Sequence, residues 1–146
     1  MSDLRPSAVV LDLDGTILES EKLALACFQQ ACLDVGIAEV DLRVYNRCVG
    51  TTQETTETIM RKGYGPEFPF EAVSQRWSDI YQTQILQTAI PRRPGIEMLL
   101  ERLRALQIPM AVVTSSRRTT VETKLNKSEL AEYFEFTVCG GETAFG

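Results

Sequence analysis

Residues 8–16 read AVVLDLDGT, and this stretch decides the predicted fold. The apolar residues at 8–11 do not alternate with polar ones, which is typical of a strand buried on both faces of a parallel sheet. Asp12 and Asp14 follow at once, and Gly15 comes after them. Because side chains two apart on an extended chain project to the same side, the two carboxylates are expected to lie together where the strand ends.

Two carboxylates held close together repel each other unless a proton or a cation lies between them. Mg²⁺ is the natural cation, because it prefers oxygen ligands and often binds one or two carboxylates together with a substrate phosphate. Gly15 lets the backbone approach a ligand closely, so N–H groups near it are expected to bind phosphate. An ordinary Asp-Gly hairpin turn is the alternative, but the residues that follow predict a helix and not a returning strand.

Helical patterns fill residues 18–88, where apolar residues recur at helical spacing. Ser20 is a plausible N-cap for the first helix, and a rigid turn of prolines and glycine at residues 91–95 ends the segment. Such a run of helices is typical of a small bundle. The predicted helices cover residues 20–35, 41–48, 52–62 and 70–88.

Strands and helices then alternate to the end of the chain. A helix is predicted at residues 96–106, a buried strand at 109–113 that ends in Thr114-Ser115-Ser116, a helix at 117–127 and a strand at 136–139. This order predicts an α/β fold with a Rossmann-like open parallel sheet and an inserted all-α domain. The predicted domains are a core made of residues 1–17 and 89–146 and a helical cap at residues 18–88.

The composition excludes several kinds of function. The net charge of -5 leaves no basic surface of the kind that binds nucleic acid, and the absence of histidine excludes Ser-His-Asp triads and His-bearing zinc sites. No signal peptide or membrane span is visible, so the expected location is the cytoplasm. The cysteines lack metal-ligand spacing and are predicted to be small buried residues: Cys27, Cys32, Cys48 and Cys139.

With these motifs in place, the chain resembles the haloacid dehalogenase (HAD) superfamily. Residues 9–16 resemble its first motif, DxDGT after a hydrophobic strand, and Val112-Val113-Thr114 resembles its second, a hydrophobic strand ending in Thr or Ser. The helical segment lies between the motifs, where the family places its C1-type cap. The resemblance runs from about residue 8 to the end and points to the phosphoglycolate phosphatase and β-phosphoglucomutase-like group.

The resemblance implies a phosphoric monoester hydrolase that uses Mg²⁺ and acts on a small phosphorylated metabolite. Asp12 would attack phosphorus to form an aspartyl-phosphate, and Asp14 would protonate the leaving alcohol and later activate water. Mg²⁺ would bind the Asp12 carboxylate and the Asp14 backbone carbonyl. Gly15, Thr114 and Ser115 would bind the phosphoryl group.

The family also uses a lysine in a Lys-Pro sequence after the third strand, and acidic residues after a fourth strand. The chain ends at Gly146, where the Lys-Pro is expected, so we expect a C-terminally truncated and inactive form. Lys124 and Lys127 are interpreted as solvated helix positions, and substitution for the family lysine is the alternative. Glu142 is the one further candidate metal ligand.

In the family's sheet the first strand lies between the second and the fourth. Loss of the fourth strand would expose an edge of residues 9–13, and an open apolar edge invites pairing with another chain. Self-association through that edge is therefore expected, besides binding of the metabolite. Neither nucleic acid nor a membrane is an expected partner.

Three other functions stay open. A β-phosphoglucomutase-like mutase is disfavoured by Gln53 and Ala24, which stand where that group's cap arginine and the histidine beyond its first motif align. A haloacid dehalogenase is disfavoured by Asp14, because that reaction needs no acid for a phosphate ester's leaving group. A truncated chain that binds without turnover is favoured by the missing lysine and acidic motif.

Overall fold

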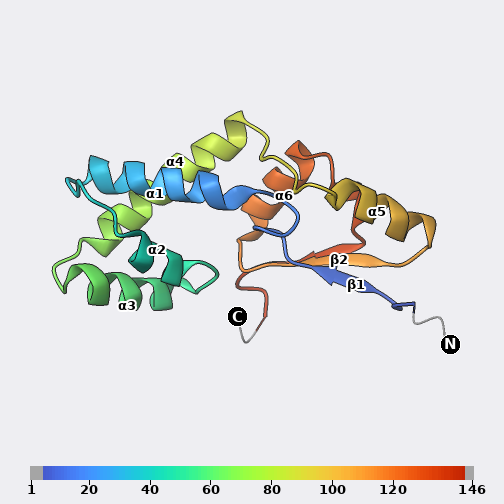
Figure 1. Ribbon diagram of the computed structural model, residues 1–146, viewed down its shortest axis with the longest axis horizontal. Helices are drawn as coiled ribbons and strands as arrows, with labels where there is room; N and C mark the ends of the chain where they lie inside the picture. Colours follow the sequence, from blue (N-terminus) through green and yellow to red (C-terminus); the bar gives the residue numbers. More distant parts are fainter. Residues whose placement is uncertain (1–4, 144–146) are drawn as a thin grey trace. The chain divides into compact units, whose positions relative to one another are not determined.

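The computed structural model of this chain describes residues 5–143. The chain divides into two compact units, one made of Met1–Ser20 with Thr88–Gly146 and the other of Glu21–Gln87. Within residues 5–143, the first unit contains all the strands, and the helices of the second unit are its only regular elements. Both are drawn in Figure 1.

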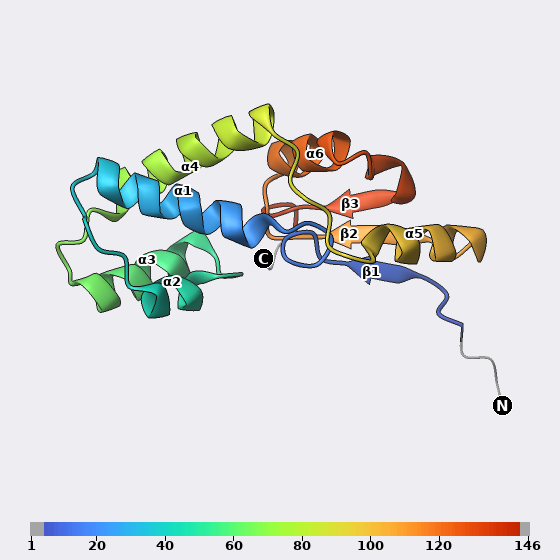
Figure 2. The same cartoon turned by 45° about the horizontal axis from the view of Figure 1, so that its top comes forward.

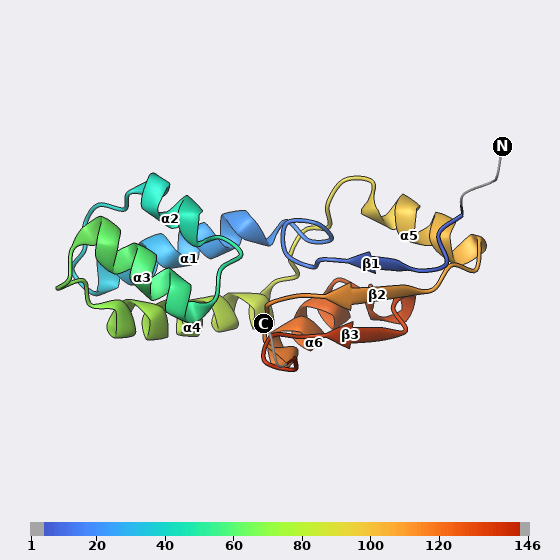
Figure 3. The same cartoon turned by 90° about the horizontal axis from the view of Figure 1, so that it is seen from below.

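Three short parallel strands form the sheet of the first unit. They are β1 (Val9–Leu11), β2 (Met110–Val113) and β3 (Phe136–Val138), paired in the order β1-β2-β3. Figure 2 and Figure 3 show them side by side in that order. The predicted open parallel α/β sheet is therefore confirmed. Its carboxyl edge carries the residues that follow β1 and β2, since parallel strands end at the same edge.

Helices cover one face of this sheet. The connections run through α5 (Ile96–Ala105) and α6 (Arg118–Lys127), which Figure 1 shows on the same side of the strands, and the short 3-10 turn η1 (Ala131–Tyr133) leads into β3. Connections between parallel strands are right-handed, and the strand order advances in one direction across the sheet. Both connecting helices therefore lie on the same face. The opposite face is apolar and partly open, because Val10 and Phe136 are 61% and 58% exposed.

The loop after β1 is short and firmly packed. The N–H groups of Ile17 and Leu18 both donate to the Leu13 carbonyl, at 3.0 and 3.1 Å, and all three side chains are fully buried. The returning chain pairs with the same loop, since the Arg93 N–H donates to the Ile17 carbonyl at 2.9 Å. The backbone that carries both aspartates is thereby fixed on each side.

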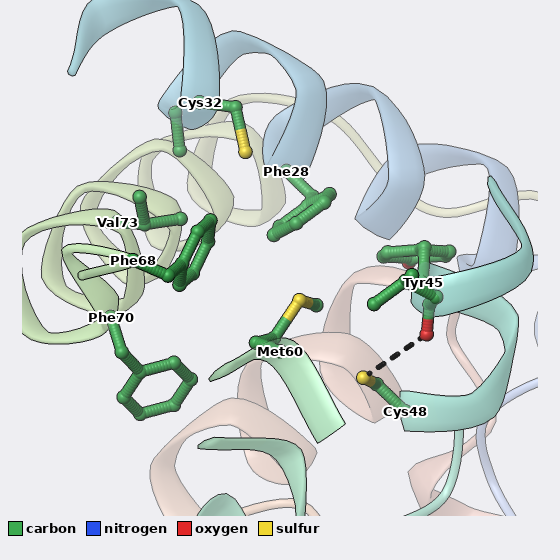
Figure 4. Close-up of a cluster of buried hydrophobic side chains, with 10 residues drawn as sticks. Phe28, Cys32, Tyr45, Cys48, Met60, Phe68, Phe70 and Val73 are labelled. Carbon is green, nitrogen blue, oxygen red and sulfur yellow. Dashed lines mark hydrogen bonds between the residues drawn. The ribbon is translucent and has the colours of Figure 1, made fainter. Parts of the chain in front are cut away.

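Four helices form the second unit around an aromatic core. They are α1 (Ser20–Asp34), α2 (Leu42–Cys48), α3 (Gln53–Tyr64) and α4 (Phe70–Gln87). The Phe28 ring lies 5.0 Å from that of Tyr45 and 5.1 Å from that of Trp77, in tilted and edge-on contacts that stabilise beyond area burial. Figure 4 shows the buried side chains of this core, among them Phe28, Tyr45, Cys32 and Cys48.

All four cysteines are buried and in the free thiol form, in agreement with the prediction that they are small core residues. Burial raises the pKa of the Cys32 thiol to about 11. A thiol with so high a pKa is almost wholly protonated near neutral pH and is therefore a poor nucleophile.

Phe28 is expected to carry much of the stability of the helical unit. Phe28→Ala should lower its free energy of unfolding by about 3–5 kcal/mol, because it removes a ring that is 1% exposed and leaves a cavity. Leu33→Ala is the matched control on the same helix, since Leu33 is 59% exposed and should cost under about 0.5 kcal/mol. Urea denaturation followed by the fluorescence of Trp77 measures both, and equal losses would contradict the assignment of the core.

Candidate active site

Two loops at the carboxyl edge of the sheet carry the candidate residues. Asp12 and Asp14 follow β1, and Thr114-Ser115-Ser116 follows β2. The Thr114 N–H donates to the Val138 carbonyl at 3.0 Å, and the Ser116 N–H donates to the Thr114 hydroxyl at 3.1 Å. The second loop is thus held against the end of β3 and closed by its own threonine.

Gly140 makes close packing of the second loop possible. Its N–H donates to the Ser116 carbonyl at 2.8 Å, and a Cβ atom at this position would lie 2.1 Å from the Ser115 carbonyl oxygen. Real Cβ atoms never come so near a backbone oxygen, so any side chain here would force the loop to move. The glycine after β3 therefore determines where Thr114 and Ser115 lie.

Asp14 is the centre of the candidate site. Its Oδ1 accepts hydrogen bonds from the Ser20 hydroxyl and from the Lys124 ammonium, both at 2.6 Å, and its Oδ2 accepts one from the Ser116 hydroxyl at 2.7 Å. These donors come from the start of α1, from α6 and from the loop after β2. One carboxylate thus joins the loop after β1 and the start of α1 to two segments that lie 102 and 110 residues further along the chain.

The environment of Lys124 differs from the one predicted from the sequence. The sequence predicts a solvated helix position for Lys124, but its side chain is only 2% exposed and forms an ion pair with Asp14. It lies on the buried side of α6 together with Thr120, Val121 and Leu125. A buried ammonium is costly unless it is paired and hydrogen-bonded, and Asp14 provides that pairing. Lys127 is exposed, as predicted.

The two aspartates have opposite electrostatic environments. Burial alone would raise the pKa of Asp14, but the charge of Lys124 and the hydrogen bonds from Lys124, Ser20 and Ser116 outweigh it, so the pKa lies below its usual value. The pKa of Asp12 is raised, chiefly because the surrounding protein removes part of its carboxylate from water and also by the charge of Asp14, although the Leu13 N–H bond at 2.8 Å opposes this. Among residues 5–143 no ion pair involves Asp12, which is exposed.

The predicted phosphate-binding residues lie in the same two loops. Gly15 has a φ of 75°, a left-handed conformation that glycine adopts without strain, and its own N–H donates to the Leu18 carbonyl at 2.8 Å. Gly15 therefore shapes the loop, and its own N–H is already used there. Thr114 is buried and Ser115 is exposed.

The described residues offer a divalent cation only part of a coordination shell. No group of three or more His, Cys, Asp or Glu side chains is close enough to hold a metal within residues 5–143. Glu142 does not help, because its carboxylate accepts from Arg118 at 2.7 Å and from the Cys139 N–H at 2.9 Å. Arg118 holds the pKa of Glu142 down at about 2. The exposed Asp12 carboxylate is the donor that fits a hard cation.

Sequence reasoning missed three members of this site. Ser20 is not an N-cap but the first residue of α1, and its hydroxyl bonds Asp14 instead. The sequence indicates Ser116 only as part of a hydroxyl cluster, whereas in the structure its hydroxyl donates to Asp14. Lys124, three residues before Lys127, has no distinctive local pattern, although its spacing of three from Val121 places it on the same face of the helix as that residue.

The comparison with family models decides the family. Residues 9–145 match the model described as haloacid dehalogenase-like hydrolase. The chain belongs to this family. The HAD resemblance that was drawn from the motifs at 9–16 and 112–114 is thereby confirmed.

Named relatives of this HAD chain include phosphatases. It is 28% identical over 132 residues to a Drosophila melanogaster protein named "Probable pseudouridine-5'-phosphatase", covering 90% of this chain and 56% of the relative. It is 20% identical over 139 residues to the "Phosphorylated carbohydrates phosphatase" of Thermotoga maritima, covering 95% and 63%. The chain thus spans about three fifths of the length of these relatives.

Solved structures confirm the HAD fold. A predicted phosphoglycolate phosphatase from Haemophilus somnus superposes with a TM-score of 0.77 at 18% sequence identity, covering 94% of this chain and 64% of that one. CbbY from Rhodobacter sphaeroides, solved with phosphate, gives a TM-score of 0.74 at 24% identity, covering 96% and 66%. At these identities the likeness establishes the α/β fold and nothing finer. No helix in the described part of the chain is long and apolar enough to cross a membrane.

The ion pair predicts unequal effects of two similar substitutions on stability. Asp14→Asn should lower the free energy of unfolding by about 3 kcal/mol, because it leaves the Lys124 ammonium buried without its counter-charge. Asp12→Asn should change it by under about 0.5 kcal/mol, since Asp12 is exposed and has no ion pair among residues 5–143. Chemical denaturation followed by circular dichroism measures both values. Equal costs for the two variants would show that the Asp14–Lys124 pair does not stabilise the fold.

Proposed function

We propose that the protein is a Mg²⁺-dependent phosphatase that hydrolyses a small phosphorylated metabolite through an aspartyl-phosphate at Asp12. The observation that carries this proposal is the unequal pair of carboxylates after β1. Asp12 is exposed and free of ion pairs within residues 5–143, whereas Asp14 is held by three hydrogen-bond donors. One carboxylate is thus available to attack, and its neighbour is held in a fixed place. The phosphatase names of two relatives support the same reaction class.

Asp12 is the proposed nucleophile. Its Oδ1 accepts the Leu13 N–H at 2.8 Å, which fixes the carboxylate plane and leaves the other oxygen for attack on phosphorus. Attack breaks the bond to the ester oxygen and leaves the phosphoryl group on Asp12. Splitting the reaction in this way replaces one difficult displacement by two easier steps.

Asp14 is the proposed acid and base. It would give a proton to the departing alcohol and later take one from the water that hydrolyses the aspartyl-phosphate. The pKa of Asp14 is lowered in the free protein, which keeps it ionised there. To act as an acid it must therefore take up a proton once the negatively charged phosphoryl group lies beside it, because a like charge disfavours ionisation.

The loop after β2 is the proposed binding site for the phosphoryl oxygens. The Thr114 hydroxyl accepts the Ser116 N–H, so its own hydrogen can donate to a phosphate oxygen, and the exposed Ser115 is a second donor. Gly15 holds the neighbouring loop in the required conformation. Donors placed in advance where charge spreads in the transition state are the main contribution a protein makes to phosphoryl transfer.

Mg²⁺ would be held by the Asp12 carboxylate and the Asp14 backbone carbonyl, as the family resemblance implies. The cation would neutralise the negative charge on the nucleophile and on the phosphate. In the described residues the donor set is incomplete, so further ligands would come from water or substrate, which Mg²⁺ commonly retains.

Hydrolysis of an aryl phosphate by the complete protein tests this function. Turnover should require Mg²⁺ and should disappear in Asp12→Asn, because the substitution removes the nucleophile while keeping the shape of the side chain. Asp14→Asn should instead accumulate phosphate on Asp12, since hydrolysis of the aspartyl-phosphate needs the base. Radiolabelled substrate and mass spectrometry measure the two effects. Full activity in excess chelator, or normal turnover by Asp12→Asn, would overturn the proposal.

The inactivity expected of the 146-residue chain stays a prediction. Its basis in the structure is that the described residues give the metal only part of a shell and that the one lysine at the site pairs with Asp14. Loss of a single stabilising donor commonly lowers a rate by about 10²–10³. We expect the purified chain to be at least about a hundredfold slower than a protein of the relatives' full length with Mg²⁺ at saturation. A rate within tenfold of the longer protein would contradict this.

Two further expectations also stay predictions. Among the described residues β1 pairs only with β2, so its other edge is open to a second chain, as self-association requires. The cytoplasmic location rests on the sequence alone.

A further inference from the structure

The ammonium of Lys124 is placed where a metal ion would otherwise compete for Asp14. Carboxylates two apart after a strand are natural ligands for one divalent cation, because each would neutralise half of its charge. In this structure the Asp14 carboxylate is already paired with a positively charged side chain, since Lys124 Nζ lies 2.6 Å from Oδ1. The hydroxyls of Ser20 and Ser116 donate to Oδ1 and Oδ2 of the same carboxylate at 2.6 and 2.7 Å.

The position of Lys124 is fixed by the fold. Its side chain is 2% exposed, and its helix α6 is packed through Val121 and Leu125, which are 0% and 4% exposed. A charge enclosed in this way cannot swing into solvent as a surface lysine does. The pair therefore persists unless another cation replaces the ammonium, and the ammonium repels any cation that approaches Asp14.

We propose that Lys124 is a positioning residue that keeps the Asp14 carboxylate out of the metal shell, so that Asp12 is the one carboxylate of the pair that binds the cation. The inference rests on the proposed function, and it adds a reason why two adjacent aspartates have different roles. Among residues 5–143 Asp12 forms no ion pair, and the charge of Lys124 lowers its pKa less than loss of water contact raises it. Asp14 has an ammonium at hydrogen-bonding distance, delivered from a helix 110 residues further along the chain.

The test measures how tightly Mn²⁺ binds, by calorimetry, in the wild-type chain and in Lys124→Met. The inference expects Lys124→Met to bind Mn²⁺ at least about tenfold more tightly, because a nearby positive charge is removed and a second carboxylate becomes free to bind. Lys127→Met is the matched control, since Lys127 lies on the same helix but is exposed. It should stay within about twofold of wild type because charges in solvent are screened.

Two further variants separate positioning from a general loss of structure. Asp14→Asn/Lys124→Met removes both charges together and should bind Mn²⁺ within about threefold of wild type. Asp12→Asn/Lys124→Met should lose the gain, because the metal needs Asp12. If Lys124 only supported packing, its loss would loosen the site and weaken binding, which is the opposite direction. Mn²⁺ bound no more tightly by Lys124→Met than by wild type overturns the inference.

Poor folding of Lys124→Met does not prevent the test. Lys124→Gln keeps a donor without the charge and should also bind more tightly than wild type. If neither variant folds alone, Mn²⁺ should restore cooperative thermal unfolding, because the cation takes the place of the ammonium. No restoration overturns the inference.

The outcomes also distinguish this inference from the proposed function. Wild-type binding that is insensitive to Asp12→Asn means that the metal assignment fails. Wild-type binding that needs Asp12 but does not tighten in Lys124→Met means that only the role of Lys124 fails. No Mn²⁺ binding in any variant overturns the role of Lys124 and leaves the phosphatase proposal to the aryl phosphate assay.

Discussion

The buried ion pair between Asp14 and Lys124 is the constraint on which the candidate site depends. A buried ammonium needs a partner, and the carboxylate that satisfies it lies directly after the first strand. The same carboxylate accepts the hydroxyls at the start of α1 and in the loop after β2. Four segments must therefore be in place before the two charges are satisfied, and this makes the carboxyl edge of the sheet one cooperative structure. Replacement of a buried ion pair by apolar residues of similar volume is often neutral or stabilising in proteins, so stability alone does not require this pair.

The pair also explains how two carboxylates can lie so close in a chain whose net charge is -5. Repulsion between Asp12 and Asp14 helps to raise the pKa of Asp12, and Lys124 opposes that effect. The site thus holds one fixed positive charge against two negative ones. The remaining negative charge is what a metal ion would meet at Asp12, the more exposed of the two.

The sheet and the first loop were predictable because their signals are local. The unbroken apolar run before Asp12 predicted β1, and the run before Thr114 predicted β2, with the parallel order confirmed by the register that pairs Val9 with Met110. The contacts around Asp14 were not predictable, because Ser20 and Lys124 belong to helices whose faces become known only when the chain is folded. In α6 the polar residues Thr119, Thr123 and Lys127 surround Lys124 in sequence, and they conceal the buried face that contains it. Buried lysines are rare, so the usual expectation of a solvated position gave the wrong answer.

The pairing of β1 with β2 has a consequence for synthesis on the ribosome. Leu11 pairs with Val112, so the whole helical segment is translated before the first strand acquires its neighbour. At about 5–20 residues per second, the roughly one hundred intervening residues take about 5–20 s. The helical unit has its own aromatic core and can fold during that interval. The nascent strand, with Val10 on its surface, meanwhile stays exposed to chaperones and to other unfinished chains.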